Sequence, residues 1–307
     1  MDKELRNKTI IVIAGPTAVG KTSVSIKLAK KMNCDIISAD SRQVYIEMNI
    51  GTAKPDEAEM QGVKHHFINN VSIVSNYDVG IYERGVNSFL KKYFEDNDIV
   101  ILTGGTGLYI EAIIKGLDDF PDIDSGIKSG LIDLYENEGI STLQKMLKES
   151  DPDYYKIVDI NNPHRLIRAL SIFKQTGVPF SKFLKKKNNN FSYDTLNILL
   201  QLPRDKLYER INKRVDIMIK TGLIEEAEQL YDYKNLKALN TVGYKELFDY
   251  FDNKISLEEA INLIKRNSRR YAKRQMTWFN NRGKWNVFSS GDFDEIYEFV
   301  NKTLFVE

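Results

Sequence analysis

Hydrophobic positions near the start of the chain follow the pattern of a parallel sheet. Residues 9–14 (TIIVIA) form a continuous run of apolar and β-branched residues, which is typical of a strand buried on both faces. Apolar residues then recur at helical spacing through residues 21–31, and residues 35–38 (DIIS) form a second short apolar run. This order of strand, helix and strand predicts an α/β fold.

The same alternation continues later in the chain. Residues 82–94 show helical periodicity, residues 99–103 (IVILT) predict a buried strand that ends at a glycine-rich turn, and residues 195–202 (TLNILLQL) predict a returning core strand. After that strand, helices are expected at residues 205–220, 223–233, 243–251 and 256–281. The last of these helices begins with Ser256 and Glu259, a pair suited to a capping box.

Residues 118–193 break this pattern, because they contain helical stretches at 126–138, 141–148 and 163–176 but no strand-like run. We therefore expect a core domain formed by residues 1–117 and 194–307, and a mostly helical insertion formed by residues 118–193. The insertion is charged unevenly. Residues 118–160 hold eleven acidic and four basic residues, whereas residues 161–193 hold seven basic residues and no acidic one.

Composition narrows the class of protein. The chain is 42% hydrophobic and 28% charged, which is typical of a globular enzyme and excludes a disordered chain. A net charge of +1 means that a nucleic acid would have to be bound by a local basic patch. Cys34 is the only cysteine, so an internal disulfide is excluded and a reducing compartment is favoured. We expect a cytoplasmic protein, because no signal peptide and no membrane-spanning run is visible.

Residues 15–22 (GPTAVGKT) match the P-loop pattern G-x-x-x-x-G-K-[ST], between a buried strand and a helix. Loop N–H groups and the helix N-terminus attract an anion, Lys21 supplies a cation, and the Thr22 hydroxyl can hold Mg²⁺. The fold class expected is therefore a P-loop NTPase-like parallel sheet flanked by helices, with the helical insertion. The predicted diphosphate site consists of Gly15, Pro16, Thr17, Ala18, Val19, Gly20, Lys21 and Thr22. This motif alone does not distinguish ATP from another diphosphate.

Further motifs follow the P-loop. Residues 39–45 (ADSRQVY) place Asp40 at the carboxyl end of a strand, where a carboxylate can serve as a base or as a metal ligand. The other motifs are GTAKP (51–55), GVKHHF (62–67), TGGTGLY (103–109), GYKE (243–246) and AKRQMTWF (272–279). In this combination, from about residue 10 to about residue 285, the sequence resembles the bacterial tRNA dimethylallyltransferases, also called tRNA isopentenyltransferases.

The resemblance implies that a dimethylallyl group moves from dimethylallyl diphosphate to N6 of adenosine 37, next to the anticodon of tRNA, with release of pyrophosphate. The P-loop then holds the leaving group, helped by Mg²⁺ on Thr22. Asp40 matches the family's catalytic aspartate, which accepts or hydrogen-bonds the N6 proton, and a magnesium-ligand role stays open beside it. Arg214 matches an arginine expected on the pyrophosphate, and its alternative is an ordinary surface arginine.

Candidate tRNA contacts come from the resemblance and from charge. The resemblance places Ser41, Arg42 and Gln43 against the flipped base and its neighbours, with Thr103 and Thr106 near the same cavity. Residues 265–284 hold eight basic residues and no acidic one, which indicates a phosphate-binding surface or else a solvated basic helix. The basic candidates are Arg165 and Arg168 in the insertion, and Arg269, Arg270, Lys273 and Arg274 in the tail. His65 and His66 are interpreted as a packed pair rather than a metal site.

Three other functions remain open at this point. A P-loop nucleotide or small-metabolite kinase would use the same loop, an adenylate isopentenyltransferase would act on free AMP, and a non-catalytic RNA-binding module would explain the basic tail. The helical insertion and the basic tail favour tRNA, because a free nucleotide needs neither. We expect tRNA and dimethylallyl diphosphate as partners, Mg²⁺ as cofactor, no membrane, and a monomer.

Overall fold

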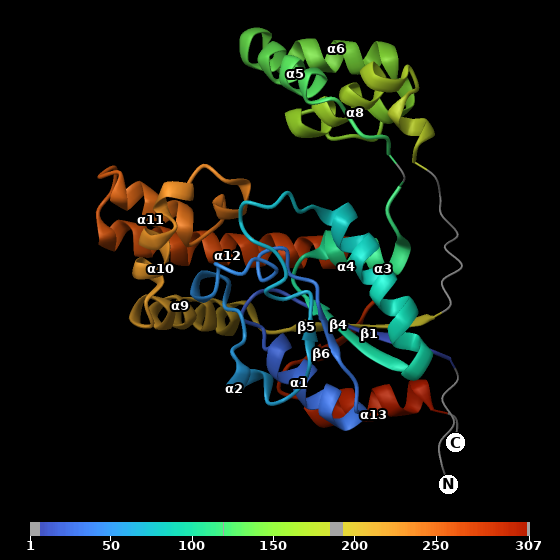
Figure 1. The fold of residues 1–307 in the computed structure, drawn as a ribbon, viewed down its shortest axis with the longest axis vertical. Coiled ribbons are helices and arrows are strands. Elements are labelled where there is room, and N and C mark those ends of the chain that lie inside the picture. The colour runs from blue at the N-terminus through green and yellow to red at the C-terminus, as the bar shows by residue number, and fades with distance from the viewer. Residues whose placement is uncertain (1–6, 119, 185–192, 306–307) are drawn as a thin grey trace. The chain divides into compact units, whose positions relative to one another are not determined.

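The computed structural model of the chain describes residues 7–118, 120–184 and 193–305. Six strands form one sheet, in the order β3-β2-β4-β1-β5-β6, and all neighbouring strands are parallel (Figure 1). The strands are β1 (Thr9–Ala14), β2 (Ile36–Ser38), β3 (His65–His66), β4 (Ile99–Gly104), β5 (Asp194–Gln201) and β6 (Asn286–Ser289). The predicted α/β fold with a parallel sheet is confirmed.

β1 lies in the middle of the sheet, where Ile11 is opposite Ile101 of β4 and Leu196 of β5. All six of its residues are buried, because helices cover both faces of the sheet. Successive side chains of a strand point to opposite faces, so Ile11 packs on one side and Val12 on the other.

Helices α1 (Lys21–Met32) and α13 (Phe293–Leu304) cover the face of Ile11, and α3 (Val79–Asp96) and α4 (Gly107–Lys115) cover the opposite face. A third apolar core forms among α9 (Arg204–Lys220), α10 (Leu223–Gln229), α11 (Tyr244–Phe251), α12 (Leu257–Asn281) and the segment that follows β2. Shorter elements of this part are η1 (Ile50–Thr52), α2 (Glu57–Met60), η3 (Tyr231–Tyr233) and η4 (Lys237–Leu239).

The chain divides into two compact units. Unit 1 consists of Met1–Ile114 and Asn190–Glu307, and unit 2 consists of Lys115–Asn189. Unit 2 corresponds to the expected insertion, for which the sequence predicted the bounds 118–193. Unit 2 contains α5 (Ser125–Glu138), α6 (Ile140–Ser150), α7 (Pro152–Tyr155), α8 (Pro163–Thr176) and η2 (Phe180–Lys182), packed around a core of its own. In unit 1, the Tyr193 hydroxyl donates to the Ile113 carbonyl at 3.3 Å, which joins the two chain segments that flank the insertion.

Several elements differ from the expectations. β3, β6, α2, α4, α7 and α13 were not predicted. The helix expected at residues 223–233 ends at Gln229, and a 3₁₀ turn follows. Gly107, expected on a turn, is the first residue of α4. Ser256 does cap α12, accepting the Glu259 N–H at 3.1 Å. Among the residues described, no helix has both the length and the apolar character that a membrane crossing requires.

Candidate active site

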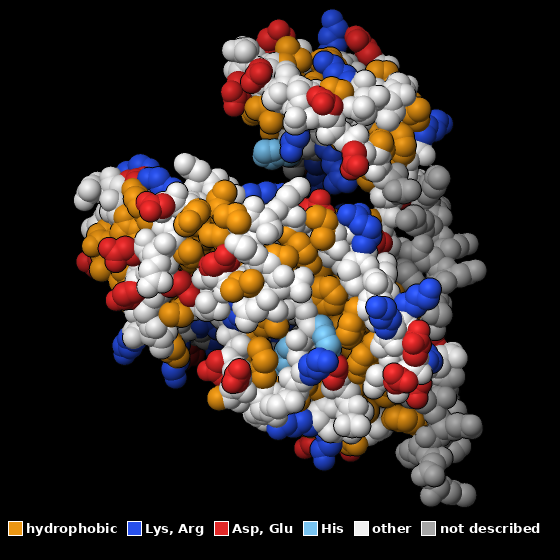
Figure 2. Space-filling model, viewed as in Figure 1, with side chains coloured by type: hydrophobic (Ala, Val, Ile, Leu, Met, Phe, Trp, Pro, Cys, Tyr) orange, Lys and Arg blue, Asp and Glu red, His pale blue; other side chains and the backbone are white. Residues whose placement is uncertain are grey.

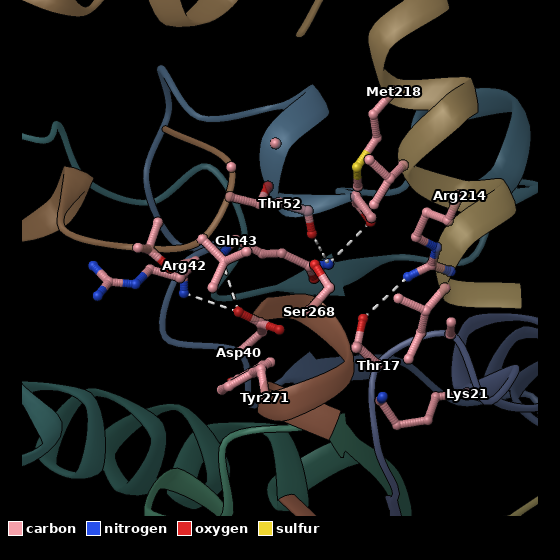
Figure 3. Close-up of a pocket in the computed structure, with 18 of the residues that line it drawn as sticks. Thr17, Lys21, Asp40, Arg42, Gln43, Thr52, Arg214, Met218, Ser268 and Tyr271 are labelled. Carbon is pink, nitrogen blue, oxygen red and sulfur yellow. Dashed lines mark hydrogen bonds between the residues drawn. The ribbon is translucent and has the colours of Figure 1, made fainter. Parts of the chain in front are cut away.

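A cavity of about 910 Å³ opens in unit 1 at the carboxyl ends of β1, β2 and β4 (Figure 3). Parallel sheets bind their ligands at this edge, because the loops after the strands converge there. The lining comes from the P-loop, residues 40–43, η1, α9, residues 240–246 and α12. Segments that lie more than 200 residues apart in the sequence therefore form one site.

Lys21 lies at the P-loop end of this cavity. Its Nζ donates to the carbonyl oxygens of Gly15 at 3.0 Å and of Pro16 at 2.8 Å. Burial lowers the pKa of Lys21 to about 8; Asp40 acts in the opposite direction, and Arg214 lowers it further. The site thus holds an ammonium group that loses its proton more easily than an ordinary lysine, and an anion would stabilise the charged form.

Two arginines of α9 reach the same loop. Arg214 NH1 donates to Thr17 Oγ1 at 3.4 Å, and burial lowers the pKa of Arg214 (Figure 3). Arg210 NH1 donates to the Val19 carbonyl at 3.2 Å. The structure therefore brings Arg214 to the diphosphate candidates as expected. Arg210 was missed, although it lies one helical turn before Arg214.

Asp40 follows β2 directly and points into the cavity (Figure 3). Its Oδ1 accepts the N–H groups of Arg42 at 2.9 Å and Gln43 at 3.4 Å. Within the described part of the chain, Oδ2 has no hydrogen-bond partner. One carboxylate oxygen thus fixes the loop, and the other remains for a substrate or a metal ion.

The residues after Asp40 hold neighbouring loops. Arg42 donates to the carbonyls of Lys237 at 3.1 Å, Ala238 at 2.6 Å and Asn240 at 3.3 Å. Gln43 Nε2 donates to the carbonyls of Thr52 at 3.2 Å and Ala53 at 3.1 Å. Both side chains line the cavity, but their polar groups already bond to backbone, which the sequence did not indicate.

Two threonines lie at the carboxyl end of β4 or just after it, and one of them, Thr106, supports the loop that carries Asp40. Thr106 Oγ1 accepts the Ser41 N–H at 3.1 Å and donates to Ser41 Oγ at 3.3 Å. Thr103 Oγ1 donates to the Ile13 carbonyl at 3.2 Å and accepts from Ser25 at 2.8 Å. Thr103 therefore lines the cavity, and its side chain bonds to β1 and to α1. Thr106 is not among the described residues that line the cavity.

Glu226 of α10 organises η1, in which the GTAKP motif begins. Its carboxylate accepts the N–H groups of Asn49 at 3.0 Å, Ile50 at 2.8 Å and Gly51 at 2.9 Å, and the Tyr244 hydroxyl at 2.6 Å. A Cβ on Gly51 would come within 2.6 Å of the Tyr244 ring, so only glycine fits there. Nothing in the sequence spacing indicated this contact.

Helix α12 forms the remaining wall. Arg270, Tyr271 and Arg274 line the cavity, and burial raises the pKa of Tyr271 to about 12. The Arg274 guanidinium lies 5.7 Å from the centre of the Tyr271 ring. Lys273, on the same helix, is exposed. Tyr271 was not among the predicted site residues, although it belongs to the same basic and aromatic segment.

Three of the eight basic residues in 265–284 bond to other elements. Lys265 pairs with Asp216 at 2.6 Å, Arg282 pairs with Glu111 at 2.8 Å, and Arg269 donates to Asn212 Oδ1 at 2.6 Å. The segment itself holds no acidic residue, but neighbouring helices supply two carboxylates. The basic surface is therefore narrower than the sequence suggested. Five basic residues of the segment are exposed and make no such bond to the described residues, namely Arg266, Arg270, Lys273, Arg274 and Lys284.

Arg165 and Arg168 lie on α8 of unit 2, and both are exposed. The Arg168 guanidinium lies 4.9 Å from the centre of the Phe120 ring, which orients it by a cation–π contact. His164, which precedes Arg165, is exposed as well, and Figure 2 shows Lys and Arg side chains in blue on the surface of this unit.

The two histidines of the GVKHHF motif form β3 and take part in packing. His65 Nδ1 is 2.8 Å from the Val63 carbonyl, and His66 Nε2 is 2.7 Å from Asp35 Oδ2. The His66 ring also packs against the Phe89 ring, with 4.2 Å between the two ring centres. Among the described residues, no three His, Cys, Asp or Glu side chains are grouped closely enough to hold a metal ion.

The chain matches the family model described as IPP transferase over residues 43–282. It is 52% identical over 297 residues to the tRNA dimethylallyltransferase of Christiangramia forsetii, a match that covers 95% of this chain and 98% of the relative. It is 47% identical over 305 residues to the tRNA dimethylallyltransferase of Flavobacterium johnsoniae, a match that covers 97% of this chain and 98% of that relative.

Two solved structures are also similar. The full-length tRNA isopentenylpyrophosphate transferase of Bacillus halodurans has a TM-score of 0.71 and 38% identity, with 96% of each chain covered. A eukaryotic dimethylallyltransferase, described as acting on tRNA, has a TM-score of 0.77 and 28% identity, with 94% of this chain and 75% of that chain covered.

Proposed function

This chain belongs to the IPP transferase family, and from that premise we propose the details of its reaction. It transfers a dimethylallyl group to tRNA. We propose that the donor is dimethylallyl diphosphate, that the acceptor is N6 of adenosine 37 next to the anticodon, and that pyrophosphate leaves. The observation that carries this proposal is the single cavity into which both the P-loop and Asp40 open.

At the donor end, the P-loop binds the diphosphate. Lys21 exchanges its bonds to the Gly15 and Pro16 carbonyls for phosphate oxygens, and Arg214 approaches the same anion from α9. Negative charge grows on the pyrophosphate as the carbon–oxygen bond breaks. These cations and the loop N–H groups stabilise that charge.

The oxygen groups of this end suit Mg²⁺. The exposed Thr22 hydroxyl at the start of α1 and the Asp40 carboxylate line the same cavity, and Mg²⁺ prefers oxygen ligands and keeps several waters when it binds phosphates. We therefore propose that Thr22 holds the ion, with Asp40 as a second candidate ligand. When bound, Mg²⁺ neutralises charge on the diphosphate.

At the acceptor end, Asp40 acts on the N6 amine. Oδ1 is fixed by the Arg42 and Gln43 N–H groups, which leaves Oδ2 to accept a hydrogen bond or a proton from the nitrogen. The amine lone pair then attacks the dimethylallyl carbon. Only an adenine extruded from its stack can reach this cavity, which Ser41 and Gln43 line beside Asp40.

We propose that the tRNA backbone is held by basic residues outside the reaction centre. Arg270, Lys273 and Arg274 on α12 provide one set, and Arg165 and Arg168 on unit 2 provide another, which contacts the anticodon stem. Phosphate contacts of this kind position a nucleic acid without reading its sequence. We also propose that the chain acts as a cytoplasmic monomer, and the opening of the P-loop and Asp40 of one chain into one cavity supports this proposal.

Transfer of label tests the proposal. The chain is incubated with radiolabelled dimethylallyl diphosphate and undermodified tRNA, and the tRNA is then digested and its nucleosides separated. Label should appear in adenosine 37 and should be absent from a tRNA that carries guanosine at that position. Phosphorylation by ATP without prenyl transfer would favour a kinase instead, and labelling of free AMP would favour an adenylate isopentenyltransferase.

A further inference from the structure

Gln275 of α12 is a buried polar residue that the reaction described above does not use. Its side chain is 6% exposed. Its Oε1 accepts the Thr17 N–H at 2.9 Å, and its Nε2 donates to the Gly105 carbonyl at 2.9 Å. One side chain thus bonds the P-loop after β1 to the glycine-rich turn after β4, and both partners are backbone groups.

The glycine-rich turn is shaped for this contact. A Cβ on Gly105 would lie 2.3 Å from Gln275 Nε2, and a Cβ on Gly107 would lie 2.2 Å from Cδ1 of Trp278, three residues further along α12. Helix α12 therefore lies against the turn at Gly105 and against the start of α4 at Gly107, and only glycine leaves enough room at either point. This close fit fixes the position of the Gln275 amide.

The two ends of this link belong to the two ends of the cavity. Thr17 accepts the Arg214 hydrogen bond, and it follows directly the two carbonyls that hold Lys21. Thr106 follows Gly105, donates its N–H to the Ala39 carbonyl at 3.2 Å and accepts from the Ser41 N–H at 3.1 Å, so it sets the loop that carries Asp40.

We propose that Gln275 is a positioning residue that sets the distance between the diphosphate-binding loop and the Asp40 loop during transfer. This inference rests on the proposed function. Gln275 lies one helical turn after Tyr271 and next to Arg274, so its link also joins both loops to the helix that faces the tRNA.

The expected effect is on the chemical step. The donor carbon is held from the diphosphate end and the amine from the Asp40 end, so an error in their spacing reduces the rate while each substrate still finds its contacts. Misplacement of reacting groups by about 1 Å can cost about 10²-fold in rate. We expect Gln275→Met, which keeps the volume but removes both hydrogen bonds, to lower the single-turnover rate constant about 10- to 100-fold.

Tyr93→Phe is the matched control. The Tyr93 hydroxyl accepts the Asp35 N–H at 3.0 Å and donates to the Ile99 carbonyl at 3.3 Å, so it also joins two backbone segments by one accepted and one donated bond. These segments lie at the amino ends of β2 and β4, away from the cavity. Tyr93→Phe should lower the free energy of unfolding by a comparable amount and leave the rate constant within about twofold.

The assay measures single-turnover transfer at saturating tRNA and donor, together with both KM values and urea unfolding. Support would be a rate constant at least tenfold lower in Gln275→Met than in Tyr93→Phe, with KM values within about threefold of the unaltered protein. Equal rate constants in the two variants, or a loss that saturating substrate restores, would overturn the proposal.

A second variant decides the case in which Gln275→Met does not fold. Gln275→Glu can still accept the Thr17 N–H but, when ionised, cannot donate to the Gly105 carbonyl. A tenfold or larger loss of the rate constant in a folded Gln275→Glu supports the link, and an unchanged rate constant overturns it. Failure of the proposed function would be distinguishable, because the unaltered protein would then transfer no label.

Discussion

Replacing Asp40 by asparagine separates the structural task of this residue from its chemical task. Oδ1 accepts two backbone N–H groups, and the carbonyl oxygen of asparagine can accept the same two. The loop should therefore keep its conformation, and the free energy of unfolding should change by less than about 1 kcal/mol. What disappears is the second carboxylate oxygen and its ability to take a proton.

The size of the rate effect follows from that loss. A positioned general base contributes about 10²- to 10⁴-fold, so the activation barrier should rise by roughly 3 to 5 kcal/mol. Asp40 also raises the pKa of Lys21, so its replacement moves that pKa further below the value of about 8. The comparison is therefore repeated at several pH values below 8, so that a change in the charge of Lys21 can be separated from the loss of the carboxylate.

The assay is single-turnover transfer from radiolabelled dimethylallyl diphosphate with enzyme in excess over tRNA. Asp124→Asn is the matched control, because Asp124 Oδ1 accepts the N–H groups of Gly126 at 2.7 Å and Ile127 at 3.3 Å in the same local geometry, within unit 2. A reduction of less than tenfold for Asp40→Asn, with donor and tRNA saturating, would remove Asp40 from the chemistry.

Three further outcomes are expected. Burial lowers the pKa of Lys21 to about 8, so the positive charge of Lys21 is lost as pH rises through 8 and pyrophosphate should bind more weakly. Lys21→Arg keeps its charge over this range and should not show this weakening. Calorimetry checks both expectations by comparing the dissociation constants of pyrophosphate below and above pH 8 in the two proteins. Neutralising Arg270, Lys273 and Arg274 together should make the fall of log affinity for tRNA with log salt less steep, by about 2 in the slope. Neutralising the already paired Lys265 and Arg282 should change this slope by less than about 1. Glu226→Ala should lower the free energy of unfolding by about 2 to 4 kcal/mol in urea titrations, because four donors lose their acceptor, and the exposed Glu228→Ala should change it by less than about 0.5 kcal/mol.

Local patterns predicted the centre of the fold well. The β1 strand was predicted with its observed bounds because it is apolar throughout and ends at a recognisable loop. The edge strand β6 has only four residues and, within the part of the chain that the structure describes, pairs with β5 alone, so its formation depends on a partner far away in the sequence. Helix α13 could have been predicted from its hydrophobic spacing, since Ile296, Val300 and Leu304 recur every four residues and are all buried.

The candidate site was predictable where motif and chemistry coincide, and less so where tertiary contacts decide. The P-loop and Asp40 do open into one cavity. The bonding of Arg42 to carbonyls near η4 could not be read from the sequence, because those carbonyls lie about 195 residues away. The same limit applies to the basic tail, whose acidic partners Asp216 and Glu111 come from other helices.

The hydrogen bond between Tyr193 and Ile113 also bears on how such a chain can evolve. Because the core brings together the two points where the insertion leaves and returns, a segment there can lengthen, shorten or be exchanged without changing the register of β5 on β1. A shorter loop grafted at this junction should leave the sheet intact. Changes in the length of the insertion can therefore accumulate in evolution without disturbing the sheet that carries the reaction centre.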